Sequence, residues 1–333
     1  CDSTTGGENA QRILKQLQPV CSLGIHRFPI GRLPGLGDWV AIRHIRKHLA
    51  KMPPDILHGH GAKGGAYSRL LGHSINARAF YTPHGGSLHY KPNSIAGFVF
   101  FRLENLLSRR TDGIIFECAF SQETYRRKIG NPACAMRVIH NGIDDDDFQP
   151  HQPDDTAGDF VFVGELRQLK GVDILINAIG KLKKTGLKCT CTIVGEGVDG
   201  EVFKELTSRL GLKDWVKFVG FQPASKGFSY GRHLVIPSRA ESFPYIILEG
   251  AAAKMPIITT RVGGIEEIFG EQASLLVSPD SVESLADALE FAMKNPDEMK
   301  VRADILQQRV KDSFKVSTMA AATIDFYSSF AAG

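Results

Sequence analysis

"FVFVGELRQLKGVDILINAIGKL", residues 160–182, joins two patterns that together decide the fold. The run at 160–163 is apolar and rich in β-forming residues, and Gly164 follows it directly. Residues 169–182 then repeat apolar side chains at helical spacing. A strand that helices cover on both faces reads as an unbroken apolar run, so this stretch predicts one strand–turn–helix unit of a parallel sheet.

The same alternation continues towards the C-terminus, where helix-like segments separate short apolar runs. These predicted strands are "CTCTIVGEG" (189–197), "VKFVGF" (216–221), "HLVIPS" (233–238), "PIITT" (256–260) and "ASLLV" (273–277). The first half repeats the theme with "DILHGHG" (55–61), "RAFYTPHGG" (78–86), "DGIIFE" (112–117) and "MRVIHNG" (136–142). Alternating strands and helices predict an α/β protein with parallel sheets.

The Pro- and Asp-rich segment "HQPDDTAGD" (151–159) is the natural linker. We therefore predict two doubly wound, Rossmann-like domains at 1–150 and 151–314, with a C-terminal helix at about 315–333 packing back on the first. Ligands of such sheets bind beyond the carboxyl ends of the strands, so two facing domains would enclose a cleft. "TTGGE" (4–8) resembles the glycine turn after a first strand that is nearly absent, and we expect a truncated N-terminus.

Composition narrows the class of protein. The chain has 333 residues, of which 43% are hydrophobic and 23% charged, as in soluble globular proteins of two domains. No apolar run reaches the roughly 20 residues of a membrane span, and no signal peptide is visible. The six cysteines form no C-x-x-C pair or zinc-site spacing. We expect a cytoplasmic protein.

Charge is distributed unevenly. Residues 1–150 carry a formal charge of +7 and the remainder −3. Segment 43–51 groups Arg43, Arg46, Lys47 and Lys51, and segment 98–110 is an aromatic-rich apolar stretch that ends in Arg109 and Arg110. They are either amphipathic helices that cover a sheet, with solvated Lys and Arg, or a patch for the inner face of an anionic membrane.

The stretch "ESFPYIILE" (241–249) begins and ends with a carboxylate. Pro is favoured at the first helical position, so we expect a helix from near Phe243 with Ser242 as its cap. Eight residues at helical rise separate Glu241 from Glu249 by about 12 Å. Glycosidase carboxylates lie about 5–9.5 Å apart, so the spacing favours two ends of a long ligand over a glycosidase pair.

Backbone groups and glycines extend this predicted site. The free N–H groups at the helix start, on Tyr245 and Ile246, would form an anion site, although an ordinary capped helix reads the same way. "GELRQLKG" (164–171) follows a strand, and Lys170 offers a point charge suited to phosphate. Gly263 and Gly264 repeat the strand–glycine–helix arrangement.

Other motifs are weaker. "GEGVDG" (195–200) matches a dinucleotide-binding pattern, but the next strand does not end in the acid that would bind ribose. "DDDD" (144–147) favours a solvated loop over a metal site, because adjacent acids do not converge on one ion. His84 ends a strand and is a candidate ligand contact, whereas His58 is equally well a structural histidine.

Together these motifs resemble retaining glycosyltransferases of family 4, which have the GT-B fold, and most closely bacterial enzymes of exopolysaccharide and surface polysaccharide synthesis. The resemblance rests on "GELRQLKG", "IVGEG", "VKFVGF", "PSRAESFPYIILEGAAAKMPII" and "TRVGGIEEI", in that order, and covers nearly the whole chain. It implies transfer of a hexose from a UDP- or GDP-linked donor to a saccharide acceptor that is lipid-linked in some members, without metal or other cofactor and without nucleic acid.

The resemblance also implies roles for individual residues. Glu241 would contact the donor sugar, Glu249 the nucleotide ribose, and Lys170 the phosphates, with catalytic roles for Glu241, Lys170 and His84. The remaining donor-binding residues would be Ser242, Tyr245, Ile246, Gly263, Gly264, Gly164, Arg167, Gly195, Gly6 and Gly7.

The sequence departs from the family pattern at three places. Glu165 stands where the family usually has an arginine that binds diphosphate, and Arg167 is the candidate to substitute for that arginine. Pro244-Tyr245 replaces the usual Gly-Leu, and the first strand is missing. Two alternatives therefore stay open: a GT-B sugar-nucleotide epimerase, and a non-catalytic protein that binds a nucleotide sugar or NAD.

Overall fold

The computed structural model describes residues 1–3, 7–31, 35–85, 90 and 93–330. The chain divides into two compact units: unit 1 is Cys1–Ile115 with Lys128–Met136, and unit 2 is Phe116–Arg127 with Arg137–Gly333. Residues 137–150, which the linker pattern places in the first domain, thus group with unit 2. In the described ranges, no helix is both long and apolar enough to cross a bilayer.

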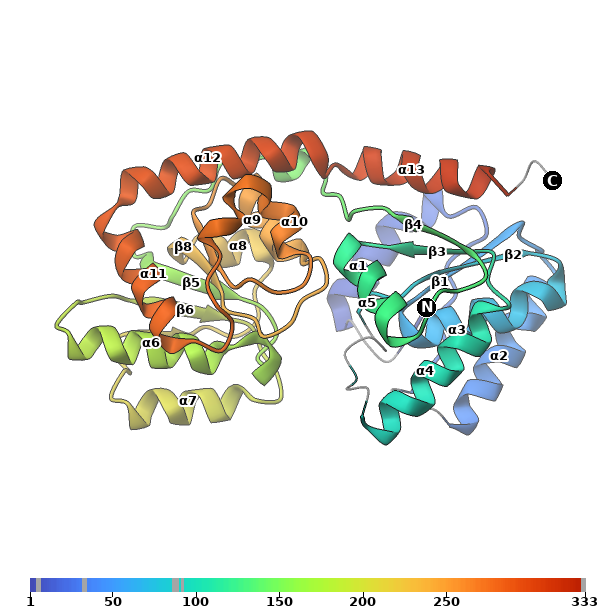
Figure 1. The fold of residues 1–333 in the computed structure, drawn as a ribbon, viewed down its shortest axis with the longest axis horizontal. Helices are drawn as coiled ribbons and strands as arrows, with labels where there is room; N and C mark the ends of the chain where they lie inside the picture. The colour runs from blue at the N-terminus through green and yellow to red at the C-terminus, as the bar shows by residue number, and fades with distance from the viewer. Residues whose placement is uncertain (4–6, 32–34, 86–89, 91–92, 331–333) are drawn as a thin grey trace. The chain divides into compact units, whose positions relative to one another are not determined.

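Unit 1 alternates strands and helices, as Figure 1 shows. Its sheet has the order β1-β2-β3-β4, with β1 parallel to β2 and β2 parallel to β3. The unit boundary falls inside β3 and β4. The elements are α1 (Gly7–Leu17), η1 (Gln18–Val20), α2 (Leu36–Leu49), β1 (Ile56–His60), α3 (Gly61–Leu71), η2 (Gly72–Ile75), β2 (Arg78–Thr82), α4 (Ile95–Ser108), β3 (Gly113–Phe116) and β4 (Ala135–Val138). The nearly absent first strand is represented by one parallel bridge between Asp2 and Phe28.

Unit 2 contains a five-stranded parallel sheet of order β7-β6-β5-β8-β9. Its strands are β5 (Gly158–Val163), β6 (Cys191–Val194), β7 (Val216–Phe218), β8 (Gly231–Ile236) and β9 (Ile257–Thr259). Its helices are α5 (Ala119–Lys128), η4 (Asp145–Asp147), η5 (Gln168–Lys170), α6 (Val172–Lys184), α7 (Gly200–Arg209), α8 (Ala224–Phe228), α9 (Tyr245–Ala252), α10 (Ile265–Phe269), η6 (Gly270–Leu275), α11 (Val282–Lys294), α12 (Pro296–Ser313) and α13 (Val316–Ser328).

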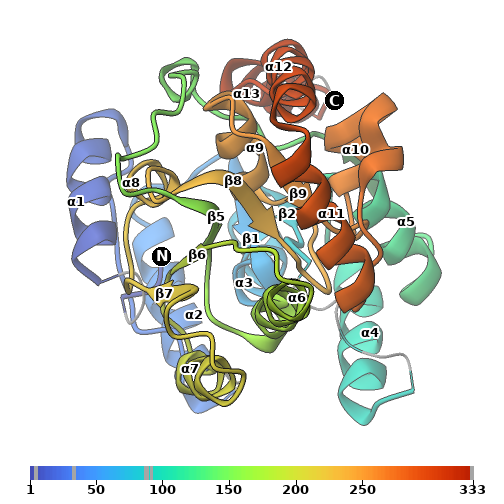
Figure 2. The same cartoon turned by 90° about the vertical axis from the view of Figure 1, so that its left-hand side faces the viewer.

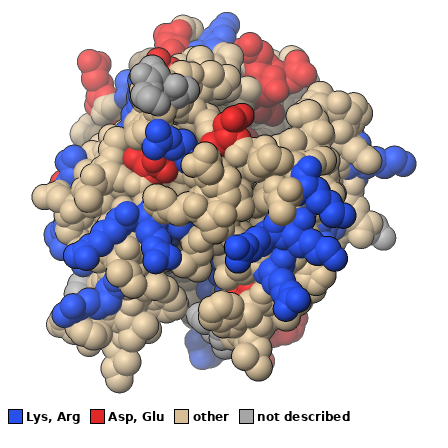
Figure 3. Space-filling view, turned by 90° about the vertical axis from the view of Figure 1, so that its right-hand side faces the viewer, with Lys and Arg blue, Asp and Glu red and all other residues tan. Residues whose placement is uncertain are grey.

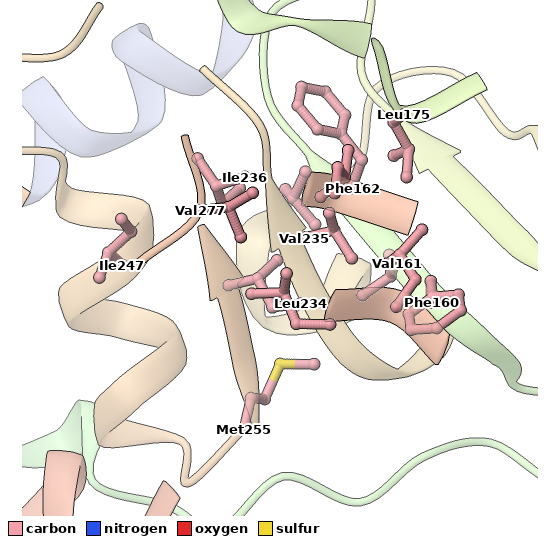
Figure 4. Packing of buried hydrophobic residues seen from close by; sticks show 14 of the residues in the cluster. Phe160, Val161, Phe162, Leu175, Leu234, Val235, Ile236, Ile247, Met255 and Val277 are labelled. Carbon is pink, nitrogen blue, oxygen red and sulfur yellow. The ribbon is translucent and has the colours of Figure 1, made fainter. Parts of the chain in front are cut away.

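The core of unit 2 explains why its strands read as apolar runs. Helices α6 and α7 lie on one face of the sheet and α8, α9 and α12 on the other (Figures 1 and 2). Successive residues of a strand point to opposite faces, so Phe160 and Phe162 share one face of β5 and Val161 lies on the other, yet all three are essentially buried. Figure 4 shows Phe160 and Phe162 packed among Leu175, Leu234 and Ile236. Both faces of β5 are therefore covered, as the apolar run predicts.

One predicted strand is wrong. Residues 273–277, "ASLLV", are not a strand, because η6 continues from α10 through Leu275. Val277 alone of this segment pairs with the sheet, in an isolated bridge to Thr260. The C-terminal helix α13 contacts Arg137 through Asp325, with 2.6 Å between the charged atoms.

Candidate functional site

The loops that follow β5 and β8 meet at the centre of the sheet in unit 2. β5 is the first strand of this sheet in the sequence, and it lies between β6 on one side and β8 on the other. The strand order therefore reverses between β5 and β8, which is where open parallel sheets bind ligands beyond their carboxyl ends. The loop after β5 carries Lys170, and the loop after β8 carries Glu241.

Lys170 and Glu241 form an ion pair across these two loops. Lys170 Nζ lies 2.7 Å from Glu241 Oε1, and Ser238 Oγ donates to the same oxygen at 2.7 Å. The Glu241 side chain is 9% exposed and that of Lys170 is 27% exposed. Two predicted site residues 71 positions apart are thus brought into direct contact, with much of their surface removed from water.

Glycines allow the two loops to approach this closely. Gly171 ends η5 with φ +70°, and a Cβ there would lie 1.9 Å from the Pro237 carbonyl oxygen. Any other residue at position 171 would push the two loops apart and would displace the adjacent Lys170. A similar closure joins Gly164 to Gly195, where a Cβ on Gly195 would lie 1.9 Å from Gly164 O.

Arg239 fixes the loop that carries Lys170. Its guanidinium binds Asp173 through two nitrogens at 2.8 and 2.7 Å and donates to the Gln168 carbonyl, while its Nε lies 2.6 Å from Asp280. Its backbone N–H donates to Leu169 O at 2.8 Å. These bonds, first those to Asp173, raise the pKa of Arg239 above its usual value. Sequence reasoning missed Arg239, although its position two residues before Glu241 places it on the same loop.

The helix that carries Glu249 begins later than predicted. α9 starts at Tyr245 with Pro244 as its N-cap, two residues beyond the expected start near Phe243. Ser242 does not cap it, because its hydroxyl donates to buried Glu117 and bonds Ser121 Oγ at 2.6 Å. The first N–H groups of the helix are consequently those of Tyr245 and Ile246, as predicted for the anion site.

Glu249 lies in the second turn of α9 and is partly buried. Burial, with a smaller contribution from the charge of Asp147, raises its pKa above the usual range. The predicted separation of about 12 Å between Glu241 and Glu249 stays a prediction.

The glycine pair after β9 packs directly on the Glu241 loop. Gly263 has φ +60°, and a Cβ there would lie 1.9 Å from Glu241 O. Gly264 N–H donates to Ser242 O at 2.7 Å, and its own Cβ would lie 2.7 Å from that oxygen. Both predicted glycines therefore have a structural reason to be glycine at this site.

Charged neighbours modify the glycine loop after β5. Arg167 lies 3.7 Å from Glu165, and both side chains are exposed. Surface ion pairs of this kind are weak, so Glu165 holds Arg167 only loosely. Arg167 is the residue expected to replace the family's diphosphate-binding arginine. Asp199 accepts from Gln168 N–H at 2.8 Å and joins the loop after β6 to this one.

A second group of side chains missed by the sequence reasoning supports α5 in unit 2. Glu267 accepts from the N–H groups of Ala119 and Phe120, each at 2.9 Å, and from His140 Nε2 at 3.0 Å. Burial acts to raise the pKa of Glu267, but these hydrogen bonds outweigh it and lower the pKa. Acidic side chains are favoured at helix N-termini, and this preference is the sequence signal that could have pointed to Glu267 as a partner of α5.

In unit 1, His84 ends the β2 segment in a left-handed backbone conformation, with φ +49°. Its exposed imidazole Nε2 is hydrogen-bonded to His60 Nδ1 at 2.9 Å. A non-glycine residue in this region is uncommon and often marks a functional site. His58 is bonded to Thr82 at 2.8 Å, which supports its structural role, and burial lowers its pKa to about 3.

Two predicted site glycines lie near the N-terminus, and the acidic run 144–147 lies in unit 2. Gly7 begins α1, whereas Gly6 lies outside the described residues. The run 144–147 forms η4, in which Asp144 and Asp147 cap one another's backbone, and Asp145 pairs with Lys315 at 3.0 Å. Over the part of the chain that the structure describes, no three His, Cys, Asp or Glu side chains are grouped to hold a metal ion.

Sequence comparison assigns both halves of the chain. Residues 143–309 match the family Glycosyl transferases group 1, and residues 5–147 match Glycosyltransferase Family 4. Glycogen synthase of Mycobacterium tuberculosis is 29% identical over 231 residues, which are 68% of this chain and 56% of that protein. The chain thus spans little more than half of that relative. An uncharacterized glycosyltransferase of Methanocaldococcus jannaschii is 30% identical over 255 residues, 73% of this chain and 67% of that protein.

Solved structures share the fold at lower identity. Sucrose-phosphate synthase from Thermosynechococcus elongatus matches with a TM-score of 0.80 at 21% identity, over 92% of this chain and 83% of that one. HepE of Anabaena, solved in complex with UDP and glucose, matches with a TM-score of 0.78 at 19% identity, over 95% and 89%. These likenesses confirm the predicted GT-B fold class.

Proposed function

The chain belongs to the group 1 glycosyl transferases and to glycosyltransferase family 4, and on this basis we propose that it is a retaining enzyme. It moves a hexose from a UDP- or GDP-linked donor to a saccharide acceptor of cell-surface polysaccharide synthesis. The observation that carries the proposal is the Lys170–Glu241 pair at the reversal of strand order between β5 and β8. HepE, which shares this fold, was solved with UDP-glucose, and that supports a nucleotide-sugar donor here.

The proposed chemistry assigns one task to each residue. The oxygen of an acceptor hydroxyl bonds to the anomeric carbon, the bond from that carbon to the phosphate oxygen breaks, and the nucleoside diphosphate leaves with the electron pair and takes up the proton of the hydroxyl. Lys170 and the N-terminal N–H groups of α9 offset the charge that develops on the leaving phosphate. Glu241 binds the donor sugar, Glu249 accepts from the ribose hydroxyls, and His84 contacts the donor sugar or the acceptor.

The proposal includes a place of action. The acceptor is lipid-linked, and the protein works in the cytoplasm with peripheral contact to the inner face of an anionic membrane through its basic N-terminal half. The formal charge of +7 on residues 1–150 supports this contact.

Donor hydrolysis across a panel of UDP- and GDP-sugars tests the function, with calorimetry of UDP, GDP and NAD. We expect one nucleotide to bind and its sugar to be released with retained configuration. Release of UDP together with an epimerised sugar in the absence of any acceptor would instead identify the epimerase. Binding of a nucleotide without any turnover, or binding of NAD alone, would identify a non-catalytic protein.

Metal independence gives a separate prediction. EDTA is expected to leave turnover unchanged, because Lys170 and the α9 N-terminus supply the positive charge that Mg²⁺ supplies elsewhere. Initial rates with and without EDTA check this. Loss of activity that Mg²⁺ or Mn²⁺ restores would contradict it.

Arg239 is expected to act as a positioning residue for Lys170. Arg239→Ala should lower kcat/KM for the donor about tenfold, because ordering one freed backbone residue costs on the order of 1–2 kcal/mol. Arg239→Lys should rescue poorly, since a lysine cannot bind Asp173 through two nitrogens.

The kcat/KM of the double variant Lys170→Ala/Arg239→Ala distinguishes a positioning role of Arg239 from a general role in stability. It should lose no more than Lys170→Ala alone, because the two residues act in series. Arg302→Ala is the matched control, since Arg302 has the same 25% side-chain exposure and pairs with Glu298 on α12. Additive losses in the double variant would refute the positioning role.

A further inference from the structure

Two helices of unit 1 turn apolar side chains outward. On α4, Ile95, Phe98, Val99 and Leu106 recur at helical spacing and are all exposed, with Phe98 at 59% and Leu106 at 61%. On α2, Leu36, Trp39 and Val40 do the same, with Trp39 at 74%. Helices that merely cover a sheet would bury these residues, so the outward stripe excludes the simple sheet-covering interpretation for these side chains.

A groove runs between these two helices over α3. Its volume is about 870 Å³, and the side chains that line it are mostly apolar. They include Trp39 and Ile42 of α2, Leu70 of α3, and Phe100, Leu103 and Leu107 of α4. Trp39 belongs both to the groove and to the outward stripe of α2, and Leu103, which lines the groove from α4, is itself 43% exposed. The groove and the outward stripes are therefore one continuous surface, which we call the α2–α4 face.

Charges on this face are one-sided. Helices α2 and α4, with the two residues after each, carry seven Lys or Arg residues against two acids. All seven basic side chains are exposed: Arg43, Arg46, Lys47, Lys51, Arg102, Arg109 and Arg110.

Both acids of the face are already matched within unit 1. Asp38 binds Lys63 at 2.7 Å and accepts from Tyr67, and buried Glu104 binds Arg69 at 2.7 Å and Tyr81 at 3.1 Å. The net positive charge is therefore available to an anionic partner. A second copy of the chain seated face to face would bring the basic residues of α2 against one another, which disfavours a symmetric dimer.

We propose that the α2–α4 face docks on an anionic lipid bilayer. Its apolar rim enters the headgroup boundary, the groove receives hydrocarbon from a membrane lipid, and the basic residues lie at the level of the phosphates. Exposed apolar residues beside Lys and Arg are the pattern of proteins that lie on membranes, and Trp is favoured at that boundary. The inference rests on the proposed function, because it names the surface by which a lipid-linked acceptor is reached. Figure 3 shows the side that lies to the right in Figure 1, where Lys and Arg side chains gather in groups separated by uncharged surface.

Fluorescence of Trp39 gives a direct test in the full chain. The protein has two tryptophans, and Trp215→Phe leaves Trp39 as the only one. With phosphatidylcholine vesicles that contain phosphatidylglycerol, we expect a blue shift of Trp39 emission and flotation with the vesicles, both weakened by salt. Pure phosphatidylcholine vesicles should give little of either.

Variants separate the contributions of charge and apolar contact. Arg43→Glu/Arg46→Glu/Lys47→Glu should lower partition to anionic vesicles about 100-fold or more, since each basic residue contributes about a factor of five to ten. Phe98→Ser/Leu106→Ser should lower it about tenfold or more. The matched control, Lys184→Glu/Lys188→Glu/Lys213→Glu, makes the same charge change at exposed positions of unit 2 and should bind as the parent does.

Three results would overturn the proposal: equal binding to both vesicle types, no binding at low salt, or equal loss in the control variant. A blue shift that grows with protein concentration without vesicles would identify a second copy as the partner instead. Donor hydrolysis in solution needs no bilayer, so the charge-reversed variant should keep it. If the parent protein hydrolyses a donor but does not bind vesicles, the docking face is rejected and the proposed function stands. If it binds vesicles but hydrolyses no donor, the proposed function is rejected and the docking face stands.

Discussion

Lys170→Ala is expected to lower kcat about 30- to 1,000-fold, which corresponds to about 2–4 kcal/mol of lost transition-state stabilisation. Lys170 supplies the point charge that we assign to the leaving diphosphate. Removing it also leaves Glu241, whose side chain is 9% exposed, with Ser238 in place of its ion-pair partner. Single-turnover measurements with saturating donor check this, since they separate the chemical step from donor binding.

Two controls make the Lys170 result interpretable. Lys170→Arg keeps the charge but changes its shape, and it should recover only part of the rate. Lys254→Ala removes a lysine that pairs with Asp304 at 2.7 Å elsewhere in unit 2, and it should leave the rate unchanged. If Lys170→Ala turns over as the parent does, the phosphate is bound by Arg167 or by backbone N–H groups, and the assignment of Lys170 is wrong.

The strands of unit 2 could be predicted because burial on both faces leaves a mark on composition. "FVFV" at 160–163 and "CTIV" at 191–194 have no polar face, and the structure places both inside the sheet. The segment 273–277 is also a short, largely apolar run and yet is mostly η6, since such a run does not by itself distinguish a strand from a turn of helix.

The members of the site could be predicted but their contacts could not. Lys170 and Glu241 are 71 residues apart, and their pairing depends on β5 lying beside β8, which no local pattern encodes. Arg239 was missed for the same reason, because its partners are distant in the sequence: Asp173 lies in the first turn of α6 and Asp280 in the segment before α11. Ser242 was expected to cap α9, but Glu117, 125 residues away, binds its hydroxyl instead.

Local sequence patterns also do not show whether the apolar stripe of a helix faces the sheet or the solvent. The segments 43–51 and 98–110 fit either a helix that covers a sheet or one that presents apolar side chains outward, because both have the same period. The exposed fractions of Phe98 and Leu106 in the second segment, and of Trp39 on the helix that contains most of the first, distinguish the two interpretations.

Glu249→Ala and Glu241→Ala are expected to fail in different ways. Glu249 lies in the second turn of α9, on the side of the site that we assign to the ribose, so its loss should weaken binding of free UDP or GDP about 10- to 100-fold. Glu241 pairs with Lys170 and is the residue that we assign to the donor sugar, so its loss should lower kcat about 100-fold or more with little change in nucleotide affinity. Calorimetry of the free nucleotide and single-turnover rates measure the two quantities separately.

The raised pKa of Glu249 adds a dependence on pH that identifies the residue. Burial and Asp147 raise this pKa, so the carboxylate takes up a proton as pH falls through a range where an ordinary Glu stays charged. A protonated carboxyl group is a poor acceptor of hydrogen bonds from the ribose hydroxyls. Nucleotide affinity should therefore decline at mildly acidic pH. Glu249→Gln carries no titrating group at this position. The nucleotide's own phosphate titrates with both proteins, so the difference between the two pH profiles of nucleotide affinity reports Glu249 alone. Parallel profiles, or equal loss of nucleotide affinity in Glu241→Ala and Glu249→Ala, would show that the two carboxylates do not divide the donor between them.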